Sequence, residues 1–269
     1  MNKDRFKINF NLKKLDEVLL WGEKPHRSIH WFGLTDGLLW IDVGEQTIYE
    51  YSEDAQKYFG ECHPYNDYQL SRFLEDFSNL FRYIGESVPL DLYNAVKDFT
   101  FKDKVDAWVE MYFEQSNEVF DRFLEADYMG VEWFNKRIMD SGHLIGGPLI
   151  GFFRYENKMK IIWDSTYKIE NGCNMWKSPS GTVEISYKMF VEEVVRFFRA
   201  FYSAMDEQVE NAVNRDWGDV SLDKIRLVNE NAERKESFDQ MLDFLSRTPF
   251  NTDWDSVRQA YRKMLSGMG

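Results

Sequence analysis

The chain opens with strict alternation of apolar and polar side chains. Phe6, Ile8 and Phe10 alternate with Lys7 and Asn9, and this period of two predicts a half-buried strand. A strand-rich stretch over 28–51 then predicts a three-strand meander. Its expected parts are strands at 29–34, 38–43 and 47–51, a tight hairpin turn at Asp36-Gly37, and a second turn at Gly44.

Phenylalanine-rich stripes at helical spacing follow. The apolar positions of 70–84 lie on one helix face, and Asp67 is placed to cap its first turn. A second stripe runs from Val105 to Phe123. A shorter helix is expected to end near Met139, with Gly142 as its left-handed C-cap.

Strand character returns over 149–187. Glu156-Asn157 predicts the turn of a hairpin, and 182–187 alternates again. A helix at 187–213 follows, roughly 40 Å long at 1.5 Å per residue. The polar segment 214–234 shows weak helical period, and two further helices are expected at 235–246 and 252–265. The second opens at Thr252 with the spacing of a capping box.

These elements predict an α+β fold, in which antiparallel sheet segments at about 6–51 and 149–187 pack against Phe-rich amphipathic helices. No linker rich in Pro, Gly or Ser separates the parts, so residues 1–269 are expected to form a single domain. The regions 1–90 and 145–213 share an outline, which leaves a duplicated origin open. Residues 214–269 would then be a helical C-terminal extension.

Composition and charge narrow the function. The net charge of −13 and the absence of a basic patch argue against direct binding of nucleic acid, and favour a basic protein partner. Cys62 and Cys173 are far apart in sequence, which predicts a reducing compartment rather than a disulfide framework. No stretch approaches the roughly 20 apolar residues of a membrane span. We therefore expect a cytoplasmic protein that does not enter a membrane.

Reactive constellations are weak. His26 and His30 fall in a predicted strand entry, where residues four apart lie about 13 Å from each other. Cys62-His63 is a loop pair without further ligands, and Cys173 with His143 would need the fold to bring them together. Gly146-Gly147-Pro148 does not match a phosphate-binding loop. We therefore expect no catalytic set, no metal site and no cofactor.

Tryptophans beside carboxylates are the candidate binding residues. Trp31, Asp36 and Trp40 flank the predicted hairpin, and an exposed tip there would offer a ligand or partner contact. Trp163, Asp164 and Trp176 are the analogous exposed positions in the second sheet, because Trp is enriched at the energetic centres of protein interfaces.

The same residues resemble a bacterial family of uncharacterised domains. The resemblance rests on Trp21-Gly22, on the run His30-Trp31-Phe32-Gly33-Leu34-Thr35-Asp36-Gly37, and in the second half on Phe153-Arg154, Ile162-Trp163-Asp164 and Trp176. It covers about residues 6–213 and implies no activity. Where that family tends to carry an Arg near the Trp-Asp strand, this chain has Ile161 and Ser165 instead.

The leading hypothesis is a non-enzymatic acidic binding protein, specifically an immunity or inhibitor protein that covers a basic toxin or nuclease. A metal-dependent hydrolase or nuclease using the scattered carboxylates Asp140, Glu156 and Asp164 is the first alternative. The second is an oligomeric scaffold module whose charged 214–236 segment and C-terminal helices dock a neighbour.

Overall fold

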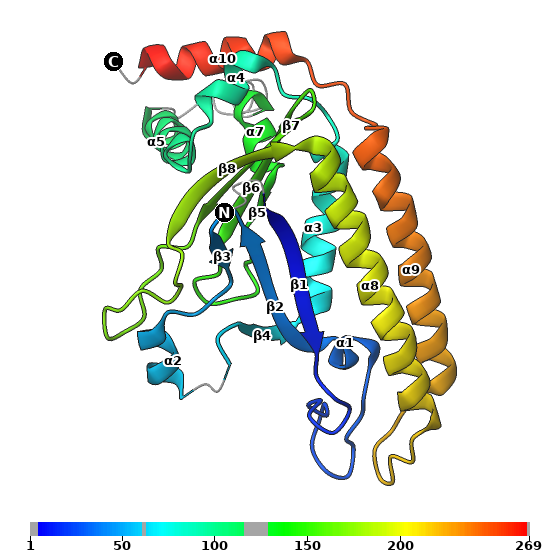
Figure 1. The fold of residues 1–269 in the computed structure, drawn as a ribbon. Helices are drawn as coiled ribbons and strands as arrows, with labels where there is room; N and C mark the ends of the chain where they lie inside the picture. The colour runs from blue at the N-terminus through cyan, green and yellow to red at the C-terminus, as the bar shows by residue number, and fades with distance from the viewer. Residues whose placement is uncertain (1–4, 61–62, 116–128, 268–269) are drawn as a thin grey trace.

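The computed structural model describes residues 5–60, 63–115 and 129–267, and they form an α+β fold with two antiparallel sheets (Figure 1). Strands are β1 (Phe6–Leu12), β2 (Asp36–Val43), β3 (Gln46–Ile48), β4 (Asn66–Gln69), β5 (Ile138–Met139), β6 (Leu149–Tyr155), β7 (Lys158–Asp164) and β8 (Ser180–Ser186). Helices are α1 (Trp31–Leu34), α2 (Glu53–Phe59), α3 (Leu70–Ile84), α4 (Leu90–Ala95), α5 (Thr100–Gln115), α7 (Met129–Asn135), α8 (Tyr187–Asn214), α9 (Lys224–Ser246) and α10 (Trp254–Gly267).

The first sheet has β2 at its centre, paired with β1 on one side and with β3 and β4 on the other. The second sheet runs in the order β5-β6-β7-β8. In Figure 1, α3, α8 and α9 stand side by side along one flank of both sheets, and α4, α5, α7 and α10 lie beyond the far end. The predicted fold class is therefore confirmed.

The second sheet is buried on both faces. Phe152 and Ile161 face the main core, which also contains the apolar stripes of α3 and α8. Phe153 and Ile162, their neighbours in sequence, face a second core formed with α4, α5, α7 and α10. Because successive strand residues point to opposite faces, two apolar faces require an almost continuous apolar run, as found at Leu149–Tyr155.

The predicted hairpin at Asp36-Gly37 is wrong. The segment expected as its first arm forms α1, and Asp36 and Gly37 begin β2. Gly37 is needed there because β1 comes close: a Cβ would lie 2.5 Å from the Asn11 carbonyl oxygen. Glycine is favoured both in tight turns and where another backbone comes close, and the sequence alone does not distinguish these two cases.

Two other boundaries also differ. Asp67 does not cap α3; it lies on β4 and pairs with Lys13 at 2.7 Å, while Gln69 precedes the helix. The helix expected to reach Met139 ends at Asn135, so Gly142 caps no helix, and Ile138–Met139 is a strand that pairs with β6. The positions Val119, Phe120 and Phe123 of the second predicted stripe lie outside the described residues.

The long helix at 187–213 is confirmed as α8, and the last helix as α10. The segment 214–234 was expected to be weakly helical, yet α9 begins at Lys224 and continues through it. Asp223 caps α9 by accepting a hydrogen bond from the Arg226 amide. At the start of α10 the amide of Ser256 donates to Asp253, one residue after the expected Thr252. No helix in the described part of the chain has the length and apolar character to cross a bilayer.

Candidate functional site

A groove runs along α9, bordered by α1, α3 and α8. Three adjoining hollows compose it, of about 220, 780 and 100 Å³. Trp31, Arg234 and Glu230 each line more than one of these hollows, which places them at its centre. We call this the α9 groove, and its charged lining residues are Glu75, Asp223, Arg226, Glu230, Glu233 and Arg234.

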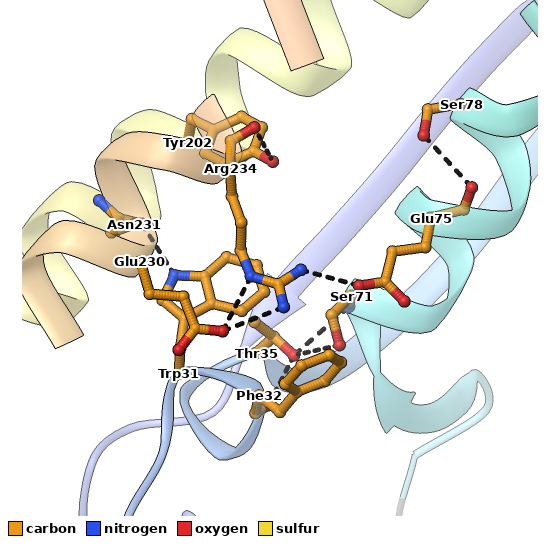
Figure 2. Close-up of polar contacts among 10 residues, drawn as sticks. All are labelled: Trp31, Phe32, Thr35, Ser71, Glu75, Ser78, Tyr202, Glu230, Asn231 and Arg234. Atoms are coloured by element: carbon orange, nitrogen blue, oxygen red, sulfur yellow. Dashed lines mark hydrogen bonds and ion pairs between the residues drawn. The ribbon is translucent and has the colours of Figure 1, made fainter. Parts of the chain in front are cut away.

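Arg234 is held in place from several sides (Figure 2). Its guanidinium carbon lies 4.3 Å from the centre of the Trp31 ring system and 4.6 Å from that of Phe32. The same group bonds Glu75 on α3 at 2.7 Å and Glu230 on α9 at 3.0 Å. A planar guanidinium suits this arrangement because it can stack on rings while its edge donates hydrogen bonds.

A second polar chain fixes the Trp31 side chain. Its indole N–H donates to Asn231 at 2.9 Å, and the Asn231 amide donates to Asp206 on α8 at 2.8 Å. Tyr202, also on α8, donates its hydroxyl hydrogen to the Arg234 carbonyl oxygen at 3.2 Å. Burial raises the pKa of Tyr202, so this phenol stays protonated at neutral pH.

The groove is acidic even after its own arginines are counted. Glu75, Asp223, Glu230 and Glu233 supply four carboxylates against Arg226 and Arg234. Because Arg234 is bonded to two of these carboxylates, its positive charge is neutralised locally. Glu233 is exposed and makes no hydrogen bond or ion pair within the described residues. Ile225, which is 78% exposed, adds an apolar side chain at the rim.

Of the residues predicted to bind, the α9 groove contains Trp31 alone. Trp31 is only 2% exposed, so the prediction of an exposed hairpin tip is wrong, although the ring does form the floor of a hollow. Asp36 is buried on β2. Burial raises the pKa of its carboxyl above the ordinary 3.8, and Lys13 opposes that rise. Trp40 is half-buried and stacks on Tyr65 with ring centres 4.2 Å apart.

The second set is also more buried than predicted. Trp163 is 3% exposed and Trp176 is 1% exposed, so the expected exposure of these rings is wrong. The Trp176 indole donates to the Gly146 carbonyl oxygen at 2.7 Å, and its ring stacks on Tyr51. Asp164 is half-buried and accepts from the Thr166 amide. Both tryptophan rings pack into the main hydrophobic core and are not available as surface contacts.

The carboxylates considered for metal-dependent chemistry do not converge. Glu156 and Asp164 lie at opposite ends of β7, roughly 20 Å or more apart by strand rise. Asp140 is engaged by the Gly142 amide. Across the ranges that the structure describes, no three His, Cys, Asp or Glu side chains gather as metal ligands would.

The pair Cys173 and His143 is not assembled into a reactive site. Cys173 lines a hollow of about 510 Å³ beside α2, together with Glu53 and Asp54. His143 instead lies 3.3 Å from the Asp76 carboxylate on α3, with its ring 5.1 Å from that of Tyr68. Cys173 and His143 therefore have different surroundings and do not form a nucleophile–base pair.

Sequence reasoning missed the residues that build the α9 groove. Glu230 and Arg234 are four apart, a spacing that stabilises a helix and could have extended the predicted helix toward Lys224. Glu75 and Asn231 gave no such signal, because their contacts join positions more than 150 residues apart.

Neither the comparison with curated proteins nor that with solved structures gives a match. A family model matches residues 7–260, which is almost the whole chain. The chain therefore belongs to the family of unknown function DUF5984.

Proposed function

We propose that this chain is a binding protein that covers a basic surface of a partner protein, in the manner of an immunity or inhibitor protein acting on a toxin or nuclease. The observation that carries the proposal is the α9 groove, in which the uncommitted carboxylate of Glu233 lies beside carboxylates bonded to Arg234. Two cysteines and no apolar span in the sequence favour an encounter in the cytoplasm.

The groove suits a cationic side chain for electrostatic and steric reasons. Each carboxylate can accept about four hydrogen bonds, and Glu75 and Glu230 use only part of that capacity on Arg234. A partner lysine or arginine can therefore bind the remaining oxygens. The net charge of −13 adds a long-range field that accelerates association with a basic partner.

An apolar contact is needed as well, because exposed ion pairs alone contribute little affinity. Ile225 at the rim is largely exposed, and Val228 one turn further on is 48% exposed. Covering these side chains would add apolar burial next to the ionic contacts, and interfaces commonly combine an apolar core with a polar rim in this way.

Affinity capture from the native cell at low ionic strength tests the proposal. We expect a basic protein to be retained and to elute as salt is raised, since screening weakens contacts between exposed charges. Hydrogen exchange of the reconstituted complex should then show protection along α9. An acidic partner, or a complex indifferent to salt, would contradict the proposal.

A further inference from the structure

Strand β8 (Ser180–Ser186) is the outer strand of the second sheet and runs for seven residues. Within the described residues it pairs with β7 alone. Figure 1 shows it in yellow-green along the outer margin of that sheet, with no strand beside its outer edge. A long outer strand can pair with a further strand unless something covers its edge.

Two hydrogen bonds fix which backbone groups of β8 point outward. The amide of Tyr187 donates to Asn157, and the amide of Ser165 donates to Pro179. Bonded pairs alternate along an antiparallel ladder, so residues 181, 183 and 185 bond to β7. The N–H and C=O groups of Ser180, Thr182 and Glu184 therefore point away from the sheet. In the part of the chain that the structure describes, none of these groups has a partner.

The other seven-residue outer strand, β1, is protected in a way that β8 is not. The outward N–H of Ile8 donates to the Glu193 side chain of α8 at 2.7 Å. The outward carbonyl of Ile8 accepts from the Arg196 guanidinium of the same helix. Among the described residues no side chain bonds to the outward groups of β8 in this way, and the strand contains neither Pro nor Lys, the residues that commonly guard an edge.

We propose that β8 pairs with β8 of a second copy of this chain, antiparallel and with Val183 on the twofold axis. In this register Thr182 of one copy faces Glu184 of the other. Both residues have outward backbone groups, so each such pair exchanges two hydrogen bonds. Val183 meets Val183, which places β-branched side chains opposite each other. The two four-stranded sheets then become one continuous sheet.

The edge of β8 lacks the free carboxylates that attract a basic partner to the α9 groove. The one charged residue of β8, Glu184, is bonded to Lys158 and to the Tyr93 hydroxyl, each at 2.7 Å. The edge therefore offers no uncommitted carboxylate to a cationic strand. Moving the axis to Glu184 would place two carboxylates directly opposite each other, which disfavours that register.

Mass measurement by light scattering across a dilution series tests the pairing. The wild-type chain should rise from 32.1 kDa toward twice that mass as concentration increases. Thr182→Pro removes an outward N–H and leaves the β7 ladder intact, because Thr182 does not donate to β7. Because the twofold axis repeats the substitution, the dimer loses two hydrogen bonds, and we expect association at least about tenfold weaker. Thr182→Val keeps the N–H and should associate like the wild type.

Hydrogen exchange of the wild-type chain provides a readout that does not depend on the folding of a variant. The Thr182 and Glu184 amides should exchange at least about tenfold more slowly in the concentrated sample than in the dilute one. A mass that stays at one chain throughout would overturn the proposal. So would Thr182→Pro associating as strongly as the wild type, or a doubled mass without protection of these two amides.

Discussion

Arg234 is the residue at which α1, α3 and α9 meet. Its guanidinium contacts two aromatic rings from α1, one carboxylate from α3 and one from its own helix α9. Each contact alone is modest, because the side chain is 26% exposed. Their convergence on one rigid, planar group is what makes the position sensitive to substitution.

Replacing Arg234 with Met should lower the free energy of unfolding by about 1–2 kcal/mol, through loss of the cation–π and ionic contacts. Lys235→Met is the matched control, because it removes the positive charge of the next residue in sequence. Lys235 forms an ion pair with Asp206, and both side chains are about half exposed. That control should change stability by less than about 0.5 kcal/mol. Equal losses in urea unfolding of the two variants would show that the stacked arrangement adds nothing.

Asp36 gives a pH test with a defined sign. Burial raises its folded-state pKa above 3.8, so ionising this carboxyl costs stability as pH rises through the folded-state value. Asp36→Asn removes that cost at neutral pH and should raise the melting temperature, on the order of 2 °C. Below pH 3.8 the wild-type carboxyl is protonated in both states, and the difference should vanish.

Asp91 provides the opposite case. A hydrogen bond from Arg258 lowers the pKa of its carboxyl, so its contribution is present above 3.8 and is lost on acidification. Asp91→Asn should therefore lower the melting temperature at neutral pH. Thermal scans in which both variants shift in the same direction would contradict these assignments.

At the scale of elements, α9 is attached by a few anchors. Over 23 residues it buries Leu227, Asn231, Phe238 and Leu245. Phe238 stacks on Phe198 of α8 with ring centres 3.6 Å apart. Met241, Leu242 and Phe244 pack partly against the same core, and Asn231, Arg234 and Lys235 add polar contacts. A helix held in this way loses much of its attachment when one buried ring is removed.

Phe238→Ala should accordingly cost about 3–5 kcal/mol in the free energy of unfolding, as large-to-small changes in a core do. Ile225→Ala on the same helix serves as the control, because that side chain is exposed and should change stability by less than about 0.5 kcal/mol. Chemical denaturation measures both. A loss below 1 kcal/mol for Phe238→Ala would mean that α9 is not anchored by this stack.

Sequence patterns predicted those elements whose period is set by one buried face. The stripe of α8 and the alternation in β1 are examples, because each packs one face on the core. The patterns failed where a tertiary contact decided the structure. Gly37 is required by the close approach of β1, and the first half of α9, which precedes the predicted helix at 235–246, shows too weak an apolar period to be recognised.

At the scale of the whole molecule, the residues of the α9 groove were the least predictable part. Trp31 was identified from its sequence context, but as an exposed contact rather than as the buried platform beneath Arg234. Burial of a Trp depends on which layer its strand or helix faces, and a single sequence does not specify that layer. The acidic character of the chain, in contrast, is visible in composition alone, and the α9 groove also contains more carboxylates than arginines.

The proposed function therefore depends on where the acidic charge acts. Glu233 lines the α9 groove, and Glu236 lies on the same helix outside it, exposed and without a bonded partner among the described residues. Reversing either charge changes the net charge by the same amount. The pair thus separates a local contact in the groove from the field of the whole molecule.

The most direct test is calorimetric titration of the captured partner into Glu233→Lys and Glu236→Lys at one low salt concentration. We predict that Glu233→Lys weakens the affinity on the order of tenfold, about 1.4 kcal/mol, and that Glu236→Lys changes it much less. Equal effects of the two substitutions, or none from either, would contradict binding of a basic partner in the α9 groove.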